Sequence, residues 1–248
     1  MARFILVHGA MSNSRIWPPT FLDGLRAKGH SVEIFSLPGQ GEDETPKAQV
    51  TLQMYADRTV AQLRSSDEPA ILVGHSMGGM VITQAADDFI AAGGSIVRLV
   101  YLTAFLPRNG QSLLDLSATA EGASDQVQAH LQVSGEPPKG MFPVAAVRPA
   151  LFNTTPVDVL AALDPASIEP QPLVPFGNPV RITDDRPIDR RYIFALQDRA
   201  ITIALQRRMA RDTAVTGTAE IDCDHMVMYS APQRLIEVLD RFAHAAAG

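Results

Sequence analysis

A serine flanked by glycines lies where an apolar run of the chain ends. Within "ILVGHSMGGM" (71–80), the stretch from Gly74 to Gly78 has the form G-x-S-x-G, with Ser76 at its centre. A strand that turns at once into a helix forces its central residue into a strained backbone, so small residues are needed two positions to either side. The hydroxyl then projects from the end of a sheet toward the N–H groups that begin the helix. This context favours a nucleophile over the alternative, a serine N-cap in a glycine-rich packing turn.

A serine becomes a good nucleophile only when a base takes its proton, and the chain has six histidines. His225 is the best candidate, because "CDHMVMYSAPQRL" follows the last predicted strand and the carboxyl ends of parallel strands share one edge. His30 begins a strand at the opposite end, His130 lies in a proline-rich segment, and His244 is near the C-terminus. We expect His75, inside the serine motif, to point away from the site as a packing residue.

An acid that orients His225 is expected at the end of the preceding strand, where Asp198 lies in "FALQDRA". Asp222 and Asp224 are alternatives by proximity in sequence. A residue so close to the histidine usually cannot fold back to its ring nitrogen, so Asp198 is preferred.

Acyl transfer also needs donors for a developing oxyanion, each worth about 10²- to 10³-fold in rate. The backbone N–H of Met77, just after the serine, is one candidate. The other is the N–H of Ala10 in "VHGAMSN", where Gly9 lets the chain turn after the first strand. His8 and Gly9 have an alternative interpretation, a strand-ending turn with a buried histidine.

The elements that must position these residues alternate between apolar runs and amphipathic segments, which is typical of βαβ units. Strands covered on both faces are nearly all apolar. The pattern predicts strands at 3–9, 31–37, 70–76, 97–105, 190–198 and 214–222, and helices at 14–28, 51–65, 78–92, 201–212 and 231–246. The expected fold class is α/β, with a mostly parallel, doubly wound sheet of about six strands.

The pattern breaks after Pro107. Residues 108–187 are rich in proline and have few clean periods, yet stretches such as "MFPVAAVRPALF" are too apolar for a disordered linker. We therefore predict a core made of 1–107 and 188–248, with 108–187 inserted as a cap subdomain over the sheet.

Composition excludes several classes of function. The net charge is −6 and no lysine or arginine cluster exceeds a pair, so the basic stripe of a nucleic-acid-binding protein is missing. With one cysteine, Cys223, no internal disulfide can form, and no cysteine and histidine spacing matches a structural metal site. The apolar run before His8 is too short for a signal-peptide core or a membrane span. These features predict a soluble, cytoplasmic protein with no metal and no membrane partner.

Four segments, "FILVHGA" with Trp17 downstream, "ILVGHSMGG", "YIFALQDRAITIALQRRMARD" and "DHMVMYSAPQRL", carry a resemblance to a known family. The chain resembles the α/β-hydrolase superfamily, and within it the group of plant hydroxynitrile lyases, methyl-salicylate and methyl-jasmonate esterases and their bacterial esterase relatives. The resemblance covers the core but not the cap. It implies a triad of Ser76, Asp198 and His225 in that order, oxyanion donors at Ala10 and Met77, no cofactor, and a cap that roofs the acyl pocket. Related folds often dimerise through the cap, so a homodimer is compatible with it.

Departures from the lyases indicate which reaction to expect. The comparable lyases use a threonine in the first loop and a lysine beside the triad histidine to manage cyanide, whereas this chain has Gly9 and Met226. Neither side chain can donate a hydrogen bond or carry charge, which favours ester hydrolysis. Ser76 also argues against dehalogenases and most epoxide hydrolases of this fold, which use an aspartate there.

The resulting hypothesis is a serine hydrolase that cleaves a small to medium apolar or aromatic carboxylic ester through an acyl-enzyme. Two alternatives stay open: a hydroxynitrile lyase or carbon–carbon hydrolase on the same triad, and a ligand receptor of the same fold without turnover. The pocket should be mainly apolar. We expect it to be lined by His8, Gly9, Met11, Trp17, Phe105, Phe142, Phe152, Phe176 and Met226, although ordinary core packing is an equally good explanation for the aromatic residues and methionines.

Overall fold

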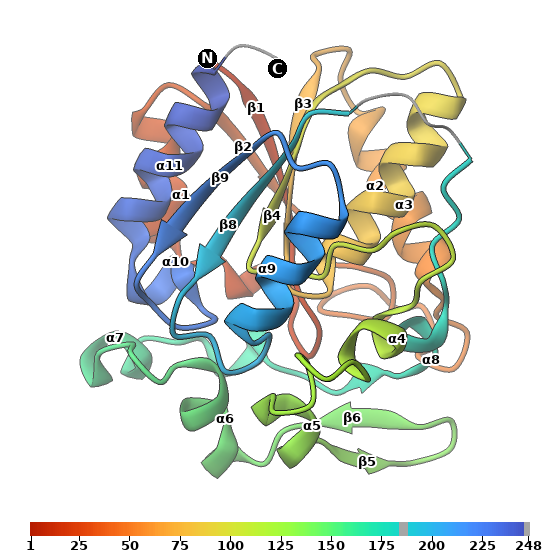
Figure 1. The fold of residues 1–248 in the computed structure, drawn as a ribbon, viewed down its shortest axis with the longest axis vertical. Coiled ribbons are helices and arrows are strands. Elements are labelled where there is room, and N and C mark those ends of the chain that lie inside the picture. The colour runs from red at the N-terminus through yellow and green to blue at the C-terminus, as the bar shows by residue number, and fades with distance from the viewer. Residues whose placement is uncertain (184–187, 246–248) are drawn as a thin grey trace.

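A single parallel sheet forms the centre of the molecule. The computed structural model describes residues 1–183 and 188–245 (Figure 1). Six strands lie in the order β2-β1-β3-β4-β8-β9, and every neighbouring pair is parallel. They are β1 (Arg3–Val7), β2 (Ser31–Ile34), β3 (Ala70–His75), β4 (Ile96–Leu102), β8 (Arg190–Ala195) and β9 (Gly217–Ile221). The prediction of an α/β fold with about six strands is confirmed, although most strands end two or three residues earlier than predicted.

Both faces of the sheet are covered by helices, as the apolar strands predict. Alternate side chains of β1 show this directly, because neighbouring residues of a strand point to opposite faces. Phe4 and Leu6 belong to one buried apolar cluster with side chains of α1 and α11, whereas Ile5 and Val7 belong to another with side chains of α2, α3 and α9 (Figure 1). These helices are α1 (Pro19–Ala27), α2 (Leu52–Leu63), α3 (Gly78–Ala91), α9 (Ile203–Asp212) and α11 (Pro232–His244).

One predicted helix, 14–28, is split in two. A 3₁₀ turn, η1 (Ser14–Ile16), precedes α1, and between them the backbone of Trp17 and Pro18 is extended. Pro18 and Pro19 cause the break, since a residue that precedes a proline is disfavoured in helical conformation. Pro19 then begins α1, a position where its missing N–H costs nothing.

The chain between β4 and β8 lies outside the main sheet, and we call residues 113–177 the roof segment. Figure 1 shows its elements grouped beyond the carboxyl ends of the strands. It contains helices α4 (Leu113–Ser117), α5 (Gln126–His130), α6 (Val144–Leu151), α7 (Val157–Ala161), η2 (Pro165–Ser167) and α8 (Val174–Gly177), and an antiparallel sheet of β5 (Gln132–Ser134), β6 (Lys139–Met141) and β7 (Gln171–Pro172). The predicted cap boundary at residue 187 and the end of the predicted last helix at 246 lie outside the described residues.

None of the helices in the described part of the chain is both long and apolar enough to cross a membrane.

Candidate active site

Ser76 occupies a strained turn between β3 and α3. Its φ is 55°, in the left-handed region that side chains other than glycine rarely adopt. The turn is tight because the carbonyl of Ser76 accepts hydrogen bonds from the N–H groups of both Gly79 and Phe105, each at 3.1 Å. A Cβ at Gly78 would lie 2.6 Å from the carbonyl oxygen of Val7, so only glycine lets the helix start this close to β1. Ser76 is half-buried while the rest of residues 71–80 is buried, so its side chain is the one that this turn presents outward.

His225 and Asp198 form a buried pair in the loops that follow β9 and β8. Nδ1 of His225 lies 2.7 Å from Oδ2 of Asp198. Further donors fix the carboxylate: Gln206 Nε2 reaches Oδ2 at 3.2 Å, and the Thr103 hydroxyl donates to the same oxygen. The amides of residues 200 and 201 donate to Oδ1 at 2.6 and 2.9 Å. A carboxylate held this way can hold the imidazole in one tautomer, with Nε2 free to accept a proton.

The two rival carboxylates are engaged elsewhere. Asp222 accepts a hydrogen bond from the side chain of Gln197 at the surface. Asp224 is fully buried, and its Oδ2 accepts four hydrogen bonds of 2.7–3.0 Å from the amides and hydroxyls of Thr154 and Thr155 in the roof segment. Asp224 therefore anchors the roof segment rather than orienting His225.

The prediction that His75 points away from the site is wrong. Its ring centroid lies 4.6 Å from that of His225, and its Nε2 lies 3.0 Å from the His225 carbonyl oxygen. Burial, with a smaller effect of the neighbouring His225, lowers the pKa of His75 well below its ordinary value, so the ring stays neutral. The loop after β9 brings the two rings together across 150 residues of sequence. The local pattern of residues 74–78 cannot reveal such a contact.

The loop after β1 carries the predicted oxyanion donor Ala10. The carbonyl of Gly9 accepts hydrogen bonds from His8 Nδ1 at 2.9 Å and from the Ser12 hydroxyl at 3.0 Å. Since the Leu37 N–H donates to His8 Nε2 at 3.0 Å, the ring proton is assigned to Nδ1. The Gly9 carbonyl and the Ala10 N–H share one planar peptide and point in opposite directions. Holding the carbonyl therefore aims the Ala10 N–H.

A cavity of about 270 Å³ lies between this loop, the serine turn and the roof segment. Its lining includes Ser76, His225, Ala10 and Met77. Six of the nine residues expected in the pocket also line it: Met11, Phe105, Phe142, Phe152, Phe176 and Met226.

The structure places the other three expected pocket residues outside the lining. His8 is fully buried behind the loop, where its hydrogen bonds hold backbone groups, and burial lowers its pKa to about 4. Gly9 lies against Ser76 without reaching the cavity lining. Trp17 packs edge-on against His75 with ring centroids 6.2 Å apart. These residues support the site from behind.

Several polar residues near the site could not be identified from the sequence. Gln128 of α5 and Asp125, the N-cap residue of this helix, line the cavity, and Thr103, just after β4, holds Asp198. Thr103 has a φ of 39°, an unusual value for a β-branched residue, and it interrupts what reads as a continuous strand over 97–105. These residues are brought close to the predicted triad by contacts between distant segments, so no local pattern marks them. Within residues 1–183 and 188–245, no group of three or more histidine, cysteine or acidic side chains could hold a metal ion.

A doubly wound parallel sheet with a serine at its strand–helix turn and a histidine–aspartate pair at the same edge defines an α/β hydrolase. The model of the alpha/beta hydrolase family matches residues 4–238, and the chain belongs to this family.

Relatives refine this assignment to the predicted group. Putative methylesterase 13, chloroplastic, of Arabidopsis thaliana is 30% identical over 96% of this chain, which spans only 55% of that relative. Methylesterase 7 of the same plant is 29% identical, with 97% of each chain covered. The crystal structure of a pyrethroid hydrolase from Sphingobium faniae has a TM-score of 0.87 at 27% identity, covering 99% of this chain and 98% of that one. The predicted resemblance to methylesterases and bacterial hydrolases is confirmed.

Proposed function

We propose that the protein is a serine carboxylesterase that works through an acyl-enzyme. The observation that carries the proposal is the buried His225–Asp198 pair, whose histidine lines the same mainly apolar cavity as the strained Ser76. The names of the methylesterase relatives support ester cleavage.

In the proposed reaction, the Ser76 oxygen attacks the ester carbonyl carbon while His225 Nε2 takes the hydroxyl proton. The carbonyl oxygen becomes an oxyanion that accepts hydrogen bonds from the backbone N–H groups of Ala10 and Met77. Collapse of this intermediate breaks the bond to the alcohol oxygen, and His225 returns the proton to the leaving alcohol. Water, activated by the same histidine, then hydrolyses the acyl-enzyme to the carboxylic acid and restores Ser76.

The cavity indicates a small to medium ester with apolar or aromatic groups. Its volume of about 270 Å³ is at the lower end for small-molecule sites, and aromatic side chains from the roof segment, such as Phe142 and Phe152, line it. In this proposal the roof segment acts as a cap whose side chains select the acyl and alcohol groups. The similarity to a pyrethroid hydrolase supports hydrolysis as the reaction.

Cyanohydrin cleavage is the competing reaction, and the cavity argues against it. Met226 lines the cavity beside His225, and an uncharged thioether cannot hold a cyanide ion as a lysine would. A Cβ at Gly9 would lie 2.8 Å from the Cβ of Ser76, so the site has no space for a threonine hydroxyl there.

The test is turnover of p-nitrophenyl acetate by the wild type and Ser76→Ala. Removing a triad nucleophile costs about 10⁶-fold in kcat in serine hydrolases, so the variant should show no activity above background. Ser95→Ala, at an exposed serine, is the matched control and should retain full activity. Multiple turnovers distinguish the proposal from a receptor, which is acylated at most once. Equal activity of wild type and Ser76→Ala would refute the mechanism, and release of cyanide from a cyanohydrin would favour the lyase.

A further inference from the structure

The roof segment is joined to the loop that carries Ala10. Residues 166–171 run antiparallel to residues 11–13, with a β-bridge between Ser12 and Ile168. The N–H of Glu169 donates to the Met11 carbonyl at 3.1 Å, and the N–H of Asn13 donates to the carbonyl of residue 167 at 3.2 Å. The loop therefore takes part of its backbone hydrogen bonding from a segment more than 150 residues away.

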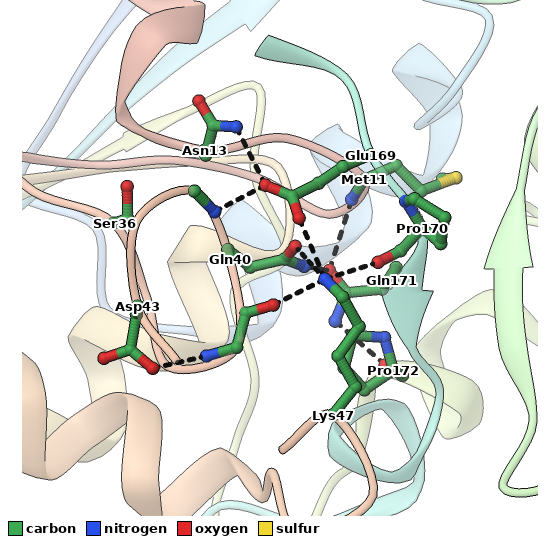
Figure 2. Close-up of polar contacts among 12 residues, drawn as sticks. Met11, Asn13, Ser36, Gln40, Asp43, Lys47, Glu169, Pro170, Gln171 and Pro172 are labelled. Carbon is green, nitrogen blue, oxygen red and sulfur yellow. Dashed lines mark hydrogen bonds and ion pairs between the residues drawn. The ribbon is translucent and has the colours of Figure 1, made fainter. Parts of the chain in front are cut away.

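Gln171 is the side chain at the centre of this junction (Figure 2). It is fully buried, and its Oε1 accepts hydrogen bonds from the Met11 N–H at 3.2 Å and from Gln40 Nε2 at 2.9 Å. Its Nε2 donates to the Tyr55 hydroxyl at 3.0 Å and to the Pro172 carbonyl at 2.9 Å. These four partners define the orientation of the amide. If it were reversed, its NH₂ group would face two other donors, the Met11 N–H and Gln40 Nε2.

The bond to Met11 acts on the backbone next to the proposed oxyanion donor. Met11 has a φ of 54°, which is unfavourable by about 1 kcal/mol or more for a residue with a side chain. Such a conformation persists only where its surroundings hold it, and the Met11 N–H is held by Gln171. This N–H belongs to the peptide that follows Ala10, so Gln171 holds the backbone on the carboxyl side of Ala10, while His8 and Ser12 hold the Gly9 carbonyl on its amino side. If the bond to Gln171 is lost, Met11 can relax from its strained conformation, and this movement would shift Ala10 and its N–H relative to the cavity.

A second connection braces the same junction (Figure 2). Lys47 Nζ lies 2.9 Å from Glu169 Oε2 and 3.0 Å from Gln40 Oε1. The other oxygen of Glu169 accepts hydrogen bonds from Asn13 Nδ2 at 2.8 Å and from the N–H of residue 41 at 2.6 Å. Burial alone would raise the pKa of Glu169, but these donors outweigh it and lower the pKa, so the ion pair is present at neutral pH.

We propose that Gln171 is a positioning residue for the oxyanion donor Ala10, braced through Gln40 by the Lys47–Glu169 ion pair. This inference rests on the proposed esterase function and goes beyond it. It makes the roof segment part of the transition-state site, in addition to its role as a wall of the pocket.

The test is Gln171→Met, which keeps the length of the side chain and removes the acceptor for the Met11 N–H. Loss of a whole oxyanion donor costs about 10²- to 10³-fold, so a displaced donor should lower kcat on p-nitrophenyl acetate by about tenfold or more. KM should change less than about twofold, because the carbonyl carries little negative charge in the ground state. A trifluoromethyl ketone inhibitor, whose adduct with Ser76 places an oxyanion at this position, should bind more weakly by the same factor as the loss in kcat.

Gln84→Met is the matched control. Gln84 is also a buried glutamine, and it links α3 to the backbone of residue 181 away from the loop. The Gln84→Met variant should be destabilised in thermal unfolding about as much as Gln171→Met, while keeping kcat within about twofold of the wild type. Hydrogen–deuterium exchange of the peptide 9–17 should be faster in Gln171→Met and unchanged in Gln84→Met. This measurement reports directly on the mobility of the loop in the folded protein.

The outcomes separate the inference from the proposed function. If the wild type hydrolyses the ester and Ser76→Ala does not, an unchanged kcat in Gln171→Met overturns the positioning role alone. A rise in KM with unchanged kcat, or an equal loss of kcat in Gln84→Met, also overturns it. If the wild type does not hydrolyse the ester, both the function and the inference fail.

Discussion

Gly9 lies so close to Ser76 that one added methyl group should displace this proposed nucleophile. In Gly9→Ala, the new Cβ would lie 2.8 Å from the Cβ of Ser76 and 3.2 Å from His75 Nδ1. Ordinary contact begins at 3.4 Å, so one of these groups must move by about 0.6 Å. Ser76 is held by backbone hydrogen bonds on both sides, and the loop of Gly9 is held by His8 and Ser12. A misplacement of about 1 Å can cost about 10²-fold in rate, so we expect a loss of about 10- to 100-fold in kcat.

The assay is kcat and KM for p-nitrophenyl acetate, with thermal unfolding measured alongside. Overpacking of this kind typically destabilises a protein by about 1–3 kcal/mol, which should leave the variant folded at 25 °C. Gly177→Ala is the control, because its nearest neighbour would be 3.8 Å away, and it should keep wild-type activity. Activity of Gly9→Ala within twofold of the wild type would refute the argument that this contact positions the nucleophile.

Two further predictions concern buried ionisable groups. Burial lowers the pKa of His8 from 6.5 to about 4, so between these pH values the unfolded chain binds a proton that the folded protein does not. As the pH falls through this range, the free energy of unfolding should therefore fall by about 3 kcal/mol, and urea titrations should show a shallower pH dependence in His8→Gln. Asp125 is the only cavity-lining carboxylate in the described part of the chain, and its charge opposes an anionic substrate by about 2 kcal/mol at about 8 Å in a medium of effective dielectric constant about 20. Asp125→Asn should raise kcat/KM for the p-nitrophenyl monoester of glutaric acid, relative to that for p-nitrophenyl hexanoate, by about 30-fold. An unchanged ratio would show that Asp125 does not face the acyl group.

Local patterns were sufficient to identify residues that the structure brings to one edge of the sheet as the centre of the candidate site. The apolar run before Ser76 and the glycines around it describe a strand, a turn and a helix, and the structure has β3, a left-handed serine and α3 there. Asp198 and His225 were found because parallel strands end at one edge, so a residue just after a strand is placed by the sheet itself. The structure brings these two within 2.7 Å of each other.

Residues placed by long-range packing were not found. Gln171 contacts Met11 across 160 residues, and nothing in the sequence around "EPQPLV" distinguishes this glutamine from a solvated one. The roof segment is the part with the weakest periodicity, since its helices are mostly four or five residues long and show too few turns for a pattern. Side-chain direction was equally hard to predict, as His75 shows.

Asp224 joins the roof segment to the loop after β9, which carries His225. It directly precedes His225, yet its carboxylate binds Thr154 and Thr155 rather than the imidazole, so the loop after β9 holds the roof with one residue and presents the base with the next. Gln171 joins the same roof segment to the loop of Ala10. The proposed base and the proposed oxyanion donor therefore lie in two loops of the core that are both tied to the roof segment. A change that loosens the roof should then reduce the rate of the chemical step as well as change the shape of the pocket.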